Sequence, residues 1–519
     1  MSRFFITTAI DYTNAPPHIG HAYEKVLADV LARYHRLKGE DVFFLTGVDQ
    51  HGQKVQQSAE KQGIAPQEFV DGVTQKFIAL WEKLDVRYDA WAATTDAKHK
   101  DCVRAILDRL NREGQIYKAK RAGHYSVRQE QFLTDKERNE QGEFGPEWGQ
   151  VEFREEENYY FKLADHQQWL LELIDKRSAA GRPFVVPDFR VAELRNAVEK
   201  LEGDLCISRP KSRLSWGIPF PFDEEFVTYV WFDALVNYIS FAPGYDPASA
   251  HPPADFLRWW STVVHVIGKD IMIPAHGVYW PVMLKALGFA DEDMPTLLVH
   301  GWWNISGAKM SKSVGNVVDP NLLADKYGAE ALRYYLMSDI ATGKDADFSE
   351  ERLVQRYNTD LANNLGNLLN RTVSMAQRYR AGKLTRIPED GVSSRAEHCA
   401  SAHGGCLAWF SVDGALNQAQ LLATEANQFI EQTTPWKLAK EPAQARQLDL
   451  VLYHLAESLR IIAILISPVL PRAAAGIFTQ LNWTGPMTLA EAGWGKLPDG
   501  HVLGQPTPLF PRIEAPPAV

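Results

Sequence analysis

The amino-acid sequence predicts an α/β protein in which a parallel-sheet domain is split by an inserted subdomain and followed by an α-helical bundle. Three observations predict it. An apolar strand, an amphipathic helix and a second strand succeed one another at the start of the chain, which is the order of a βαβ unit. That alternation is interrupted between residues 118 and 225 and then resumes. From Pro320 onward the apolar pattern is almost wholly helical.

The first strand–helix–strand unit predicts where a ligand binds. Residues 4–10 predict a buried strand, residues 18–38 carry the periodicity of a helix that ends at Gly39, and residues 41–46 predict the next strand. Residues 66–112 then predict helical structure. Because ligands of open parallel sheets bind beyond the carboxyl ends of the strands, we expect the site where the first strand passes into the first helix.

The changes of pattern along the chain divide it into five segments. We expect the two halves of the sheet domain at residues 1–117 and 226–319, separated by an inserted subdomain at residues 118–225. A linker at residues 320–350 then leads to the helical bundle, which with its C-terminal tail occupies residues 351–519.

The composition is that of a globular protein with more than one core. The 519 residues are 45% hydrophobic and 23% charged. The net charge of −10 argues against indiscriminate coating of nucleic acid, although a local basic face can still bind RNA. Four scattered cysteines without a Cys-x-x-Cys pair indicate reduced thiols. With no signal peptide and no long apolar run, we expect a soluble cytoplasmic protein that does not span a membrane.

The segment His18-Ile-Gly20-His21 stands at the start of the first predicted helix. Gly20 lets a nucleotide approach the backbone closely, and the N-terminus of a helix favours negative charge. Two histidines on the first turn can donate hydrogen bonds to phosphate oxygens. Taken alone, such a pair is more often a helix cap or the edge of a core.

A second segment, Lys309-Met-Ser-Lys312-Ser313, follows a glycine-containing turn. Two lysines three residues apart among small hydroxyl residues suit a mobile loop that closes on a polyphosphate, because each ammonium is a point charge on a flexible stem. The alternative is an ordinary solvated basic loop. The presence of both segments in one chain favours a site that binds phosphates and neutralises their charge.

The two segments resemble the His-Ile-Gly-His and Lys-Met-Ser-Lys-Ser signatures of class I aminoacyl-tRNA synthetases. Segments 10–12, 46–52, 230–238 and 268–271 are similar to those of the methionyl-tRNA synthetase family. The resemblance implies a Rossmann-like catalytic domain and an anticodon-binding helical bundle. It also implies that methionine attacks the α-phosphate of ATP, which carries Mg²⁺, and that the acyl group then passes to the 3′-terminal ribose of a methionine tRNA, initiator or elongator. His18, His21, Lys309 and Lys312 would act in catalysis, and the same residues with Gly20 and Asp270 would bind ATP.

The resemblance further implies a methionine pocket in which Asp49 pairs with the substrate ammonium. A flexible thioether is well held by aromatic and apolar walls with a polar anchor. The segment 272–281 is one residue longer than the usual family pattern and lacks the aromatic residue before its histidine. We take that histidine, His276, as the pocket histidine. The remaining walls would come from Ile10, Tyr12, Trp231, Ala234, Leu235, Tyr238 and Ile271.

Many bacterial relatives carry a zinc knuckle in the inserted subdomain, and this chain departs from that pattern. The ligand-like positions hold Ser126, Gln129, Gly145 and Trp148, none of which suits tetrahedral Zn²⁺. We therefore expect no structural zinc and no other metal site. Aromatic packing among Phe132, Phe144, Trp148 and Phe153 would replace the metal.

By the same resemblance the helical bundle reads the anticodon. Asn367 and Arg371 lie at i and i+4 on one helix face, and Trp436 opens another helix. An amide and a guanidinium can bind base edges, whereas an indole stacks on an exposed base. Because the appended dimer-forming domain of many bacterial members is absent, we expect a monomer.

Two alternatives remain at this point. One is a class I synthetase for another amino acid, but the large editing insert of the leucine, isoleucine and valine enzymes does not fit within 118–225, and a cysteine enzyme is expected to use zinc. The other is an RNA-binding paralogue without aminoacylation activity, against which the intact histidine and lysine segments argue.

Overall fold

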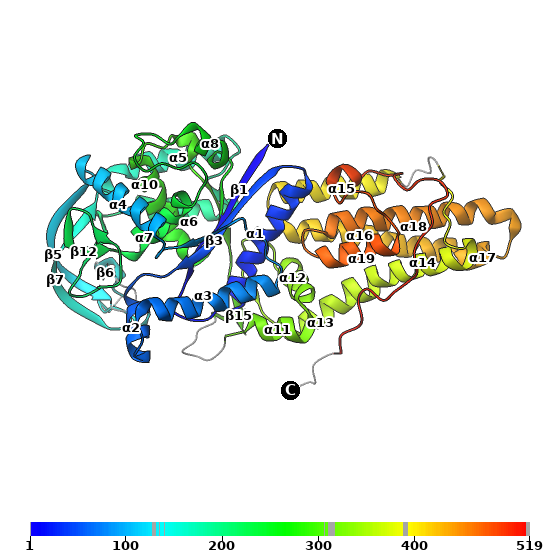
Figure 1. The fold of residues 1–519 in the computed structure, drawn as a ribbon, viewed down its shortest axis with the longest axis horizontal. Helices are drawn as coiled ribbons and strands as arrows, with labels where there is room; N and C mark the ends of the chain where they lie inside the picture. Colours follow the sequence, from blue (N-terminus) through cyan, green and yellow to red (C-terminus); the bar gives the residue numbers. More distant parts are fainter. Residues whose placement is uncertain are drawn as a thin grey trace.

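The computed structural model describes residues 2–126, 131–133, 135–139, 141–305, 307–309, 317–387 and 393–514. The molecule is elongated, with an α/β part at one end and a helical bundle at the other (Figure 1). Helix α1 (Ile19–Leu37) lies where the two parts meet. The predicted fold class is confirmed.

A seven-stranded sheet forms the centre of the α/β part. Its strands follow the order β2–β3–β1–β13–β14–β8, with β4 also paired to β3, and the pairs are parallel. The carboxyl ends of the strands therefore meet along one edge of the sheet. The strands are β1 (Arg3–Thr8), β2 (Asp11–Tyr12), β3 (Asp41–Asp49), β4 (Ala90–Ala93), β8 (Val185–Val186), β13 (Val264–Gly268) and β14 (Thr296–His300).

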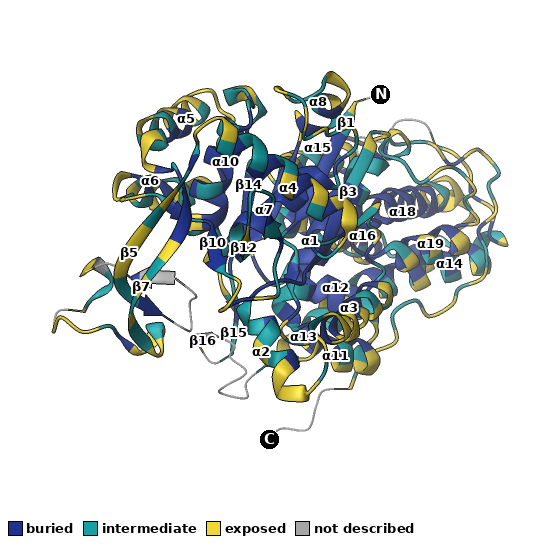
Figure 2. Ribbon diagram, turned by 60° about the vertical axis from the view of Figure 1, so that its left-hand side comes forward, coloured by how far each residue is buried: buried dark blue, intermediate teal, exposed yellow. Residues whose placement is uncertain are grey.

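The sheet separates two hydrophobic cores because successive side chains of a strand point to opposite faces. In β1, Phe4 and Ile6 join the core that contains α1 and α3, whereas Phe5 joins the core that contains α4 and α7. Figure 2 shows these layers as buried (dark blue) around the sheet. The covering helices are α2 (Gln53–Gln62), α3 (Pro66–Lys83), α4 (Ala97–Arg112), α7 (Val230–Ser240), α8 (Ala254–Trp260), α9 (Lys269–Ile271), α10 (Trp280–Ala286) and the π-helical η5 (Met272–Tyr279).

The prediction of helical structure over residues 66–112 is wrong in one place. Strand β4 separates α3 from α4 and pairs with β3 through residues 90–93. Its sequence, Ala-Trp-Ala-Ala, carries no local strand pattern, so its conformation is decided by pairing with the sheet.

The inserted subdomain is built around a long antiparallel hairpin, β5 (Ile116–Ser126) and β7 (Val151–Phe161), flanked by β6 (Gln131–Leu133) and β9 (Leu205–Cys206). Beside it lies a second antiparallel sheet of β10 (Ser208–Pro210), β12 (Asp223–Thr228) and β11 (Pro219–Phe220), and the insert also contains α5 (Gln167–Ala179) and α6 (Val191–Glu199). Residues 118–225 are not wholly separate from the seven-stranded sheet, because β8 pairs with β14.

The remainder of the chain forms the helical part. A small sheet is formed by β15 (Trp303–Ile305), β16 (Ala308–Lys309) and β17 (Ala346–Asp347), and the helices α11 (Pro320–Tyr327) and α12 (Ala329–Ser338) lie between β16 and β17 in the chain. The bundle comprises α13 (Glu350–Arg356), η7 (Tyr357–Gly366), α14 (Asn367–Arg380), α15 (Ser393–Ala408), α16 (Val412–Thr433), α17 (Pro435–Leu438), α18 (Ala445–Ile466) and α19 (Pro471–Gln480). Short 3₁₀ turns lie at 135–137, 146–148, 164–166, 188–190, 291–293, 442–444 and 489–491.

Arg333 of α12 joins the two parts. Its buried guanidinium donates to Asp29 Oδ2 of α1 at 2.7 Å, to the carbonyl of Leu84 at 3.0 Å, and to the carbonyls of Pro468 and Val469 at 2.9 Å each. A buried charge with this many acceptors is well satisfied, so the end of α18 is fixed to the helix that begins at the histidine segment.

No described helix has the length and apolar character needed to cross a membrane.

Candidate active site

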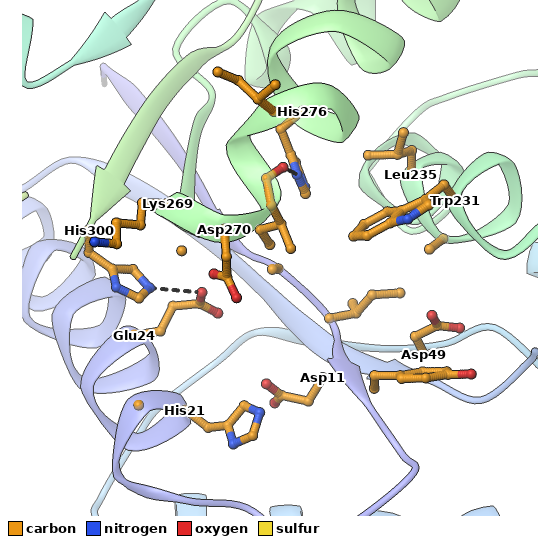
Figure 3. Close-up of a pocket in the computed structure, with 18 of the residues that line it drawn as sticks. Asp11, His21, Glu24, Asp49, Trp231, Leu235, Lys269, Asp270, His276 and His300 are labelled. Atoms are coloured by element: carbon orange, nitrogen blue, oxygen red, sulfur yellow. Dashed lines mark hydrogen bonds and ion pairs between the residues drawn. The ribbon is translucent and has the colours of Figure 1, made fainter. Parts of the chain in front are cut away.

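A cavity of about 1030 Å³ opens at the carboxyl edge of the sheet. Figure 3 shows side chains converging on it from the first strands, from α1, from α7 and from the segment after β13. Its lining includes every predicted methionine-site and ATP-site residue outside the lysine segment: Ile10, Tyr12, His18, Gly20, His21, Asp49, Trp231, Ala234, Leu235, Tyr238, Asp270, Ile271 and His276. Lys312 lies outside the described residues. The backbone of Lys309 belongs to β16, but its side chain is likewise not described.

The two histidines are tied to the start of α1 in a fixed tautomer. His18 is the N-cap, and its Nδ1 accepts the backbone N–H of Gly20 at 3.1 Å, while His21 Nδ1 accepts the backbone N–H of His18 at 3.1 Å. A neutral imidazole that accepts at Nδ1 carries its proton on Nε2. Both rings, whose centroids are 3.8 Å apart, therefore present an Nε2–H donor. A Cβ at Gly20 would lie 2.9 Å from His18 Cε1, so a larger residue would disturb this arrangement.

Asp49 is the last residue of β3 and the pairing partner of Tyr12 in β2, and its side chain lines the cavity (Figure 3). Its side chain is buried, and the backbone N–H of His51 and the hydroxyl of Thr94 lie 3.4 and 3.5 Å from its Oδ1. The Asp49 carbonyl accepts two hydrogen bonds from Thr13, which attach β2 to β3 at this point. Asp49 is thus a buried carboxylate that lines the cavity at the carboxyl end of β3.

A buried network of hydrogen bonds, which the sequence analysis did not predict, lies next to Asp49 in the fold. Asp233 Oδ2 lies 2.7 Å from His51 Nδ1, and Asp233 Oδ1 lies 2.8 Å from His99 Nε2. Burial alone would raise the pKa of Asp233, but the two imidazoles outweigh it and the pKa is lowered. Because His51 follows Asp49 and Asp233 lies in α7, the network joins the loop after β3 to the helix that carries Trp231. His51 and Asp233 stand in the segments 46–52 and 230–238, which was the available signal, whereas His99 lies in neither segment.

The apolar end of the cavity is closed by α7 and η5. The Tyr238 hydroxyl and His276 Nε2 are 2.7 Å apart, and His276 Nδ1 lies 2.9 Å from the carbonyl of Ile271. Since the carbonyl only accepts, Nδ1 carries the proton and Nε2 accepts the Tyr238 O–H. Burial lowers the pKa of His276 to about 4, so the ring is neutral at pH 7. The Trp231 ring meets the His276 ring edge-on at 6.3 Å, which completes an aromatic wall.

The opposite end of the cavity holds charged residues that sequence reasoning also missed. Lys25 is fully buried and donates to Asp11 Oδ1 at 2.6 Å, to Glu24 Oε1 at 2.8 Å and to the carbonyl of Ala9 at 2.9 Å. Glu24 Oε2 lies 3.1 Å from His300 Nε2. The sequence did contain a sign of these buried charges, because charged residues at 24 and 25 interrupt the apolar face of the helix predicted over 18–38.

The zinc-knuckle region has side chains that do not fit a metal. The Ser126 hydroxyl donates to the carbonyl of Trp148 at 2.6 Å, Gly145 offers no ligand atom, and Gln129 lies outside the described residues. No cluster of three or more His, Cys, Asp or Glu residues suited to a metal occurs within the described ranges.

The predicted aromatic replacement for the zinc is only partly present. Phe144 and Phe153 contact the ring of His124 at 5.1 and 5.6 Å, but Phe153 is 69% exposed and does not form a packed core. The side chain of Phe132 is not among those described. The better packed ring is Tyr125, over which the guanidinium groups of Arg154, Arg209 and Arg213 lie at 4.6, 5.9 and 4.7 Å.

The predicted anticodon residues lie on α14 and α17 of the helical bundle, at the end of the molecule opposite the α/β part (Figure 1). Asn367 is exposed at the start of α14, and Trp436 in α17 is 37% exposed. Arg371, one turn after Asn367, donates to Glu431 of α16 at 2.7 Å. The bundle therefore has an exposed amide on α14, a paired guanidinium one turn further on, and an accessible indole on α17.

Comparisons with known proteins match both parts of the chain. A family model described as tRNA synthetases class I (M) matches residues 4–142 and 148–373. The chain is 39% identical over 542 residues to the methionine–tRNA ligase of Listeria innocua and 40% identical over 536 residues to that of Bacillus subtilis, in each case covering 99% of this chain and 78% of the relative. The structure of Mycobacterium tuberculosis methionyl-tRNA synthetase in complex with methionyl-adenylate matches with a TM-score of 0.89 at 35% identity, over 99% of this chain and 100% of that one. The ligand-free form of the same protein matches with a TM-score of 0.85 at 32% identity, over 99% of each chain.

Proposed function

This chain belongs to the family of class I methionyl-tRNA synthetases, and we propose that the cavity at the sheet edge is its site of methionine activation and transfer. The reaction joins methionine to ATP as methionyl-adenylate, releases pyrophosphate, and passes methionine to the 3′-terminal ribose of its tRNA. The observation that carries this assignment is that the histidine segment, Asp49 and the aromatic wall line one cavity.

We infer the following roles for methionine binding. Asp49 pairs with the ammonium group, and the thioether lies against Trp231, Leu235 and the Tyr238–His276 pair. A neutral His276 suits an uncharged side chain, because a buried imidazolium would need a counter-charge. The remaining contacts would come from Ile10, Tyr12, Ala234 and Ile271.

For activation, the methionine carboxylate attacks the α-phosphorus while the bond to pyrophosphate breaks. The Nε2–H groups of His18 and His21 would donate to phosphate oxygens beside the N-terminus of α1, and Gly20 leaves room for the nucleotide. Lys309 and Lys312 would neutralise charge on the leaving pyrophosphate, and Mg²⁺ would enter as a ligand of ATP. Asp270, at the cavity lining, would accept a hydrogen bond from the ribose.

For tRNA selection, we propose that Asn367, Arg371 and Trp436 contact the anticodon. The exposure of Asn367 and Trp436 supports this assignment, because unstacked bases are bound by accessible amide and aromatic groups. The Glu431 carboxylate would restrain Arg371 before RNA binds and be exchanged for a base edge afterwards.

We further propose that this member of the family has no structural zinc and acts as a cytoplasmic monomer. The serine–carbonyl contact at Ser126 and the Tyr125–arginine stack support the first point. The four cysteines, which are not joined in disulfides, support a reducing compartment. Metal analysis of the purified protein and light scattering in solution test these points, and one stoichiometric Zn²⁺ or a stable dimer would contradict them.

The decisive experiment is ATP–pyrophosphate exchange with each amino acid, followed by aminoacylation of methionine tRNA. Exchange dependent on methionine and transfer to tRNA are the expected results. Exchange with another amino acid alone would indicate a different specificity. Exchange without transfer would indicate a paralogue that does not charge tRNA.

A further inference from the structure

Asp11 is a buried carboxyl group of the cavity that has no role in the scheme above. It lies between Ile10 and Tyr12 in the chain, is 4% exposed, and lines the cavity. Its Oδ1 accepts from Lys25, whereas its Oδ2 is buried without a hydrogen-bond partner among the described residues. Figure 3 shows its carboxyl group turned away from Asp49 and toward His21. A buried acceptor left unsatisfied in this way points to a partner supplied by the ligand.

The charges around Asp11 limit what that partner can be. Two carboxylates, Asp11 and Glu24, share the single buried ammonium of Lys25, so the three groups together carry one excess negative charge when both acids are ionised. Asp11 and Glu24 line the cavity, and Figure 3 shows the carboxyl group of Asp11 on the side where His21 lies. An anionic phosphate bound there would be repelled by an ionised Asp11, whereas a protonated Asp11 would donate a hydrogen bond to it.

The pKa of Asp11 favours the protonated form of its carboxyl group. Burial raises the pKa of Asp11 to about 7, against the opposing effect of Lys25 and with a smaller contribution from Glu24. Glu24 behaves differently, because Lys25 and His300 outweigh its burial and its pKa is lowered. The proton of this cluster therefore belongs to Asp11, and a nearby phosphate raises its affinity further.

We propose that Asp11 is a further substrate-contacting residue, which carries a proton on Oδ2 and donates it in a hydrogen bond to a phosphate oxygen of bound ATP. Lys25 is the positioning residue, because it holds Oδ1 and leaves Oδ2 to face the ligand. No proton is transferred and no bond is broken in this contact. The proposal rests on the use of ATP by this site.

A matched pair of variants separates this contact from a purely structural ion pair. In Asp11→Asn the amide oxygen can still accept from Lys25 while the amide N–H₂ replaces the carboxyl donor, whereas Asp11→Ala loses both. We expect kcat/KM for ATP in methionine-dependent exchange to fall by about tenfold to a hundredfold in the alanine variant. The asparagine variant should stay within about threefold of the wild type near pH 6, since both then donate to phosphate.

The pH profile provides the distinguishing measurement. In the wild type, kcat/KM for ATP should decline above about pH 7 as Asp11 of the free enzyme loses its proton. The asparagine variant should lack that decline, because an amide does not titrate. An unchanged profile in the asparagine variant, or a loss as large as that of the alanine variant in a folded protein, would overturn the proposal. So would an effect confined to KM for methionine, which would assign Asp11 to the ammonium group.

A second measurement does not depend on turnover. Calorimetric binding of Mg²⁺–ATP at about pH 8, in buffers of different ionisation enthalpy, gives the number of protons taken up while the phosphates themselves stay ionised. The wild type should take up more protons than the asparagine variant, and equal uptake would contradict the proposal. If the wild type bound ATP with this difference but failed to activate methionine, the proposed function would fall while the Asp11 contact stood.

Discussion

The catalytic cavity and the anticodon-binding surface proposed for the bundle use similar side chains in opposite ways. In the cavity, a carboxylate and an imidazole are buried and bonded to each other, as in the pairing of Glu24 with His300. On the bundle, Asn367 is exposed, and Arg371 forms an ion pair with Glu431, whose side chain is 60% exposed. A small substrate needs donors and acceptors that are oriented before it arrives, whereas an RNA base can be met by solvated groups. Substitutions should therefore cost much more in the cavity than on the bundle.

The largest effect is expected at the phosphate end of the cavity. His21→Ala should lower the rate of adenylate formation by about a hundredfold to a thousandfold, because one oriented donor to a developing charge is lost. Methionine binding should change little, since His21 lies away from the aromatic wall. Rapid-mixing measurement of pyrophosphate release and equilibrium titration with methionine check the two parts. His251→Ala, at an exposed histidine, is the control, and equal losses of rate and affinity in His21→Ala would contradict the assignment.

The second prediction tests whether a buried histidine makes the stability of the fold sensitive to acid in the helical bundle as well. Burial lowers the pKa of His403 in α15 to about 4, against the opposing effect of its hydrogen bond to the carbonyl of Leu465. Because the unfolded chain binds this proton from about pH 6.5 downward, stability present at pH 7 is lost as the pH falls, by about 2 kcal/mol at pH 5. Urea unfolding at the two pH values should show a smaller loss in His403→Gln, which retains a donor to Leu465.

His398→Gln, at an exposed histidine of the same helix, provides the control for this acid effect. It should lose as much stability as the wild type between the two pH values. If His403→Gln lost as much as His398→Gln, His403 would not be a source of the acid sensitivity. The expected outcome would show that a charge is unfavourable in the interior of the bundle as well. The contrast between the two regions would then depend on how exposed a side chain is and not on the domain in which it lies.

A third effect separates the two regions by function. Trp436→Ala should lower aminoacylation of methionine tRNA by about tenfold, the cost of one base stacked on an aromatic ring, and leave pyrophosphate exchange unchanged. Trp409→Ala, at a 63% exposed tryptophan elsewhere in the helical part, is the matched control and should charge tRNA normally. A parallel loss of exchange in Trp436→Ala would mean that the indole acts on the fold or on the cavity instead of on RNA.

The smallest effect is expected at the exposed ion pair. Glu431→Gln should change tRNA charging by no more than about threefold and leave stability nearly constant, because exposed pairs contribute little. Titration of charging against tRNA concentration and thermal unfolding measure the two quantities. A loss of tenfold or more would show that the Arg371–Glu431 pair is as finely arranged as the cavity, and the contrast between the regions would fail.

Much of the site could be predicted because its residues occur in short contiguous segments. His18-Ile-Gly20-His21, residues 230–238 and residues 268–271 each bring several lining residues into the cavity from one local stretch. Local periodicity likewise predicted the first strand, helix and strand, which the structure has as β1, α1 and β3. In these places side-chain type and spacing are enough, because the next residue in the chain is also the neighbour in space.

The contacts that the sequence interpretation missed join residues far apart in the chain. His51 meets Asp233 across 182 positions, and Glu24 meets His300 across 276 positions. Strand β4 was missed for the same reason, since its conformation depends on pairing with β3 rather than on its own composition.

By itself, then, the sequence determined the kind of protein and the residue types of its segments: an α/β sheet domain with a histidine segment at the start of its first helix, followed by a helical bundle. Only the tertiary structure decided that β8 of the insert completes the sheet and that Lys25 is shared between Asp11 and Glu24. The physical reason is that periodicity reports how a segment exposes its faces, whereas strand order and the sharing of a buried charge depend on which segments the fold brings together.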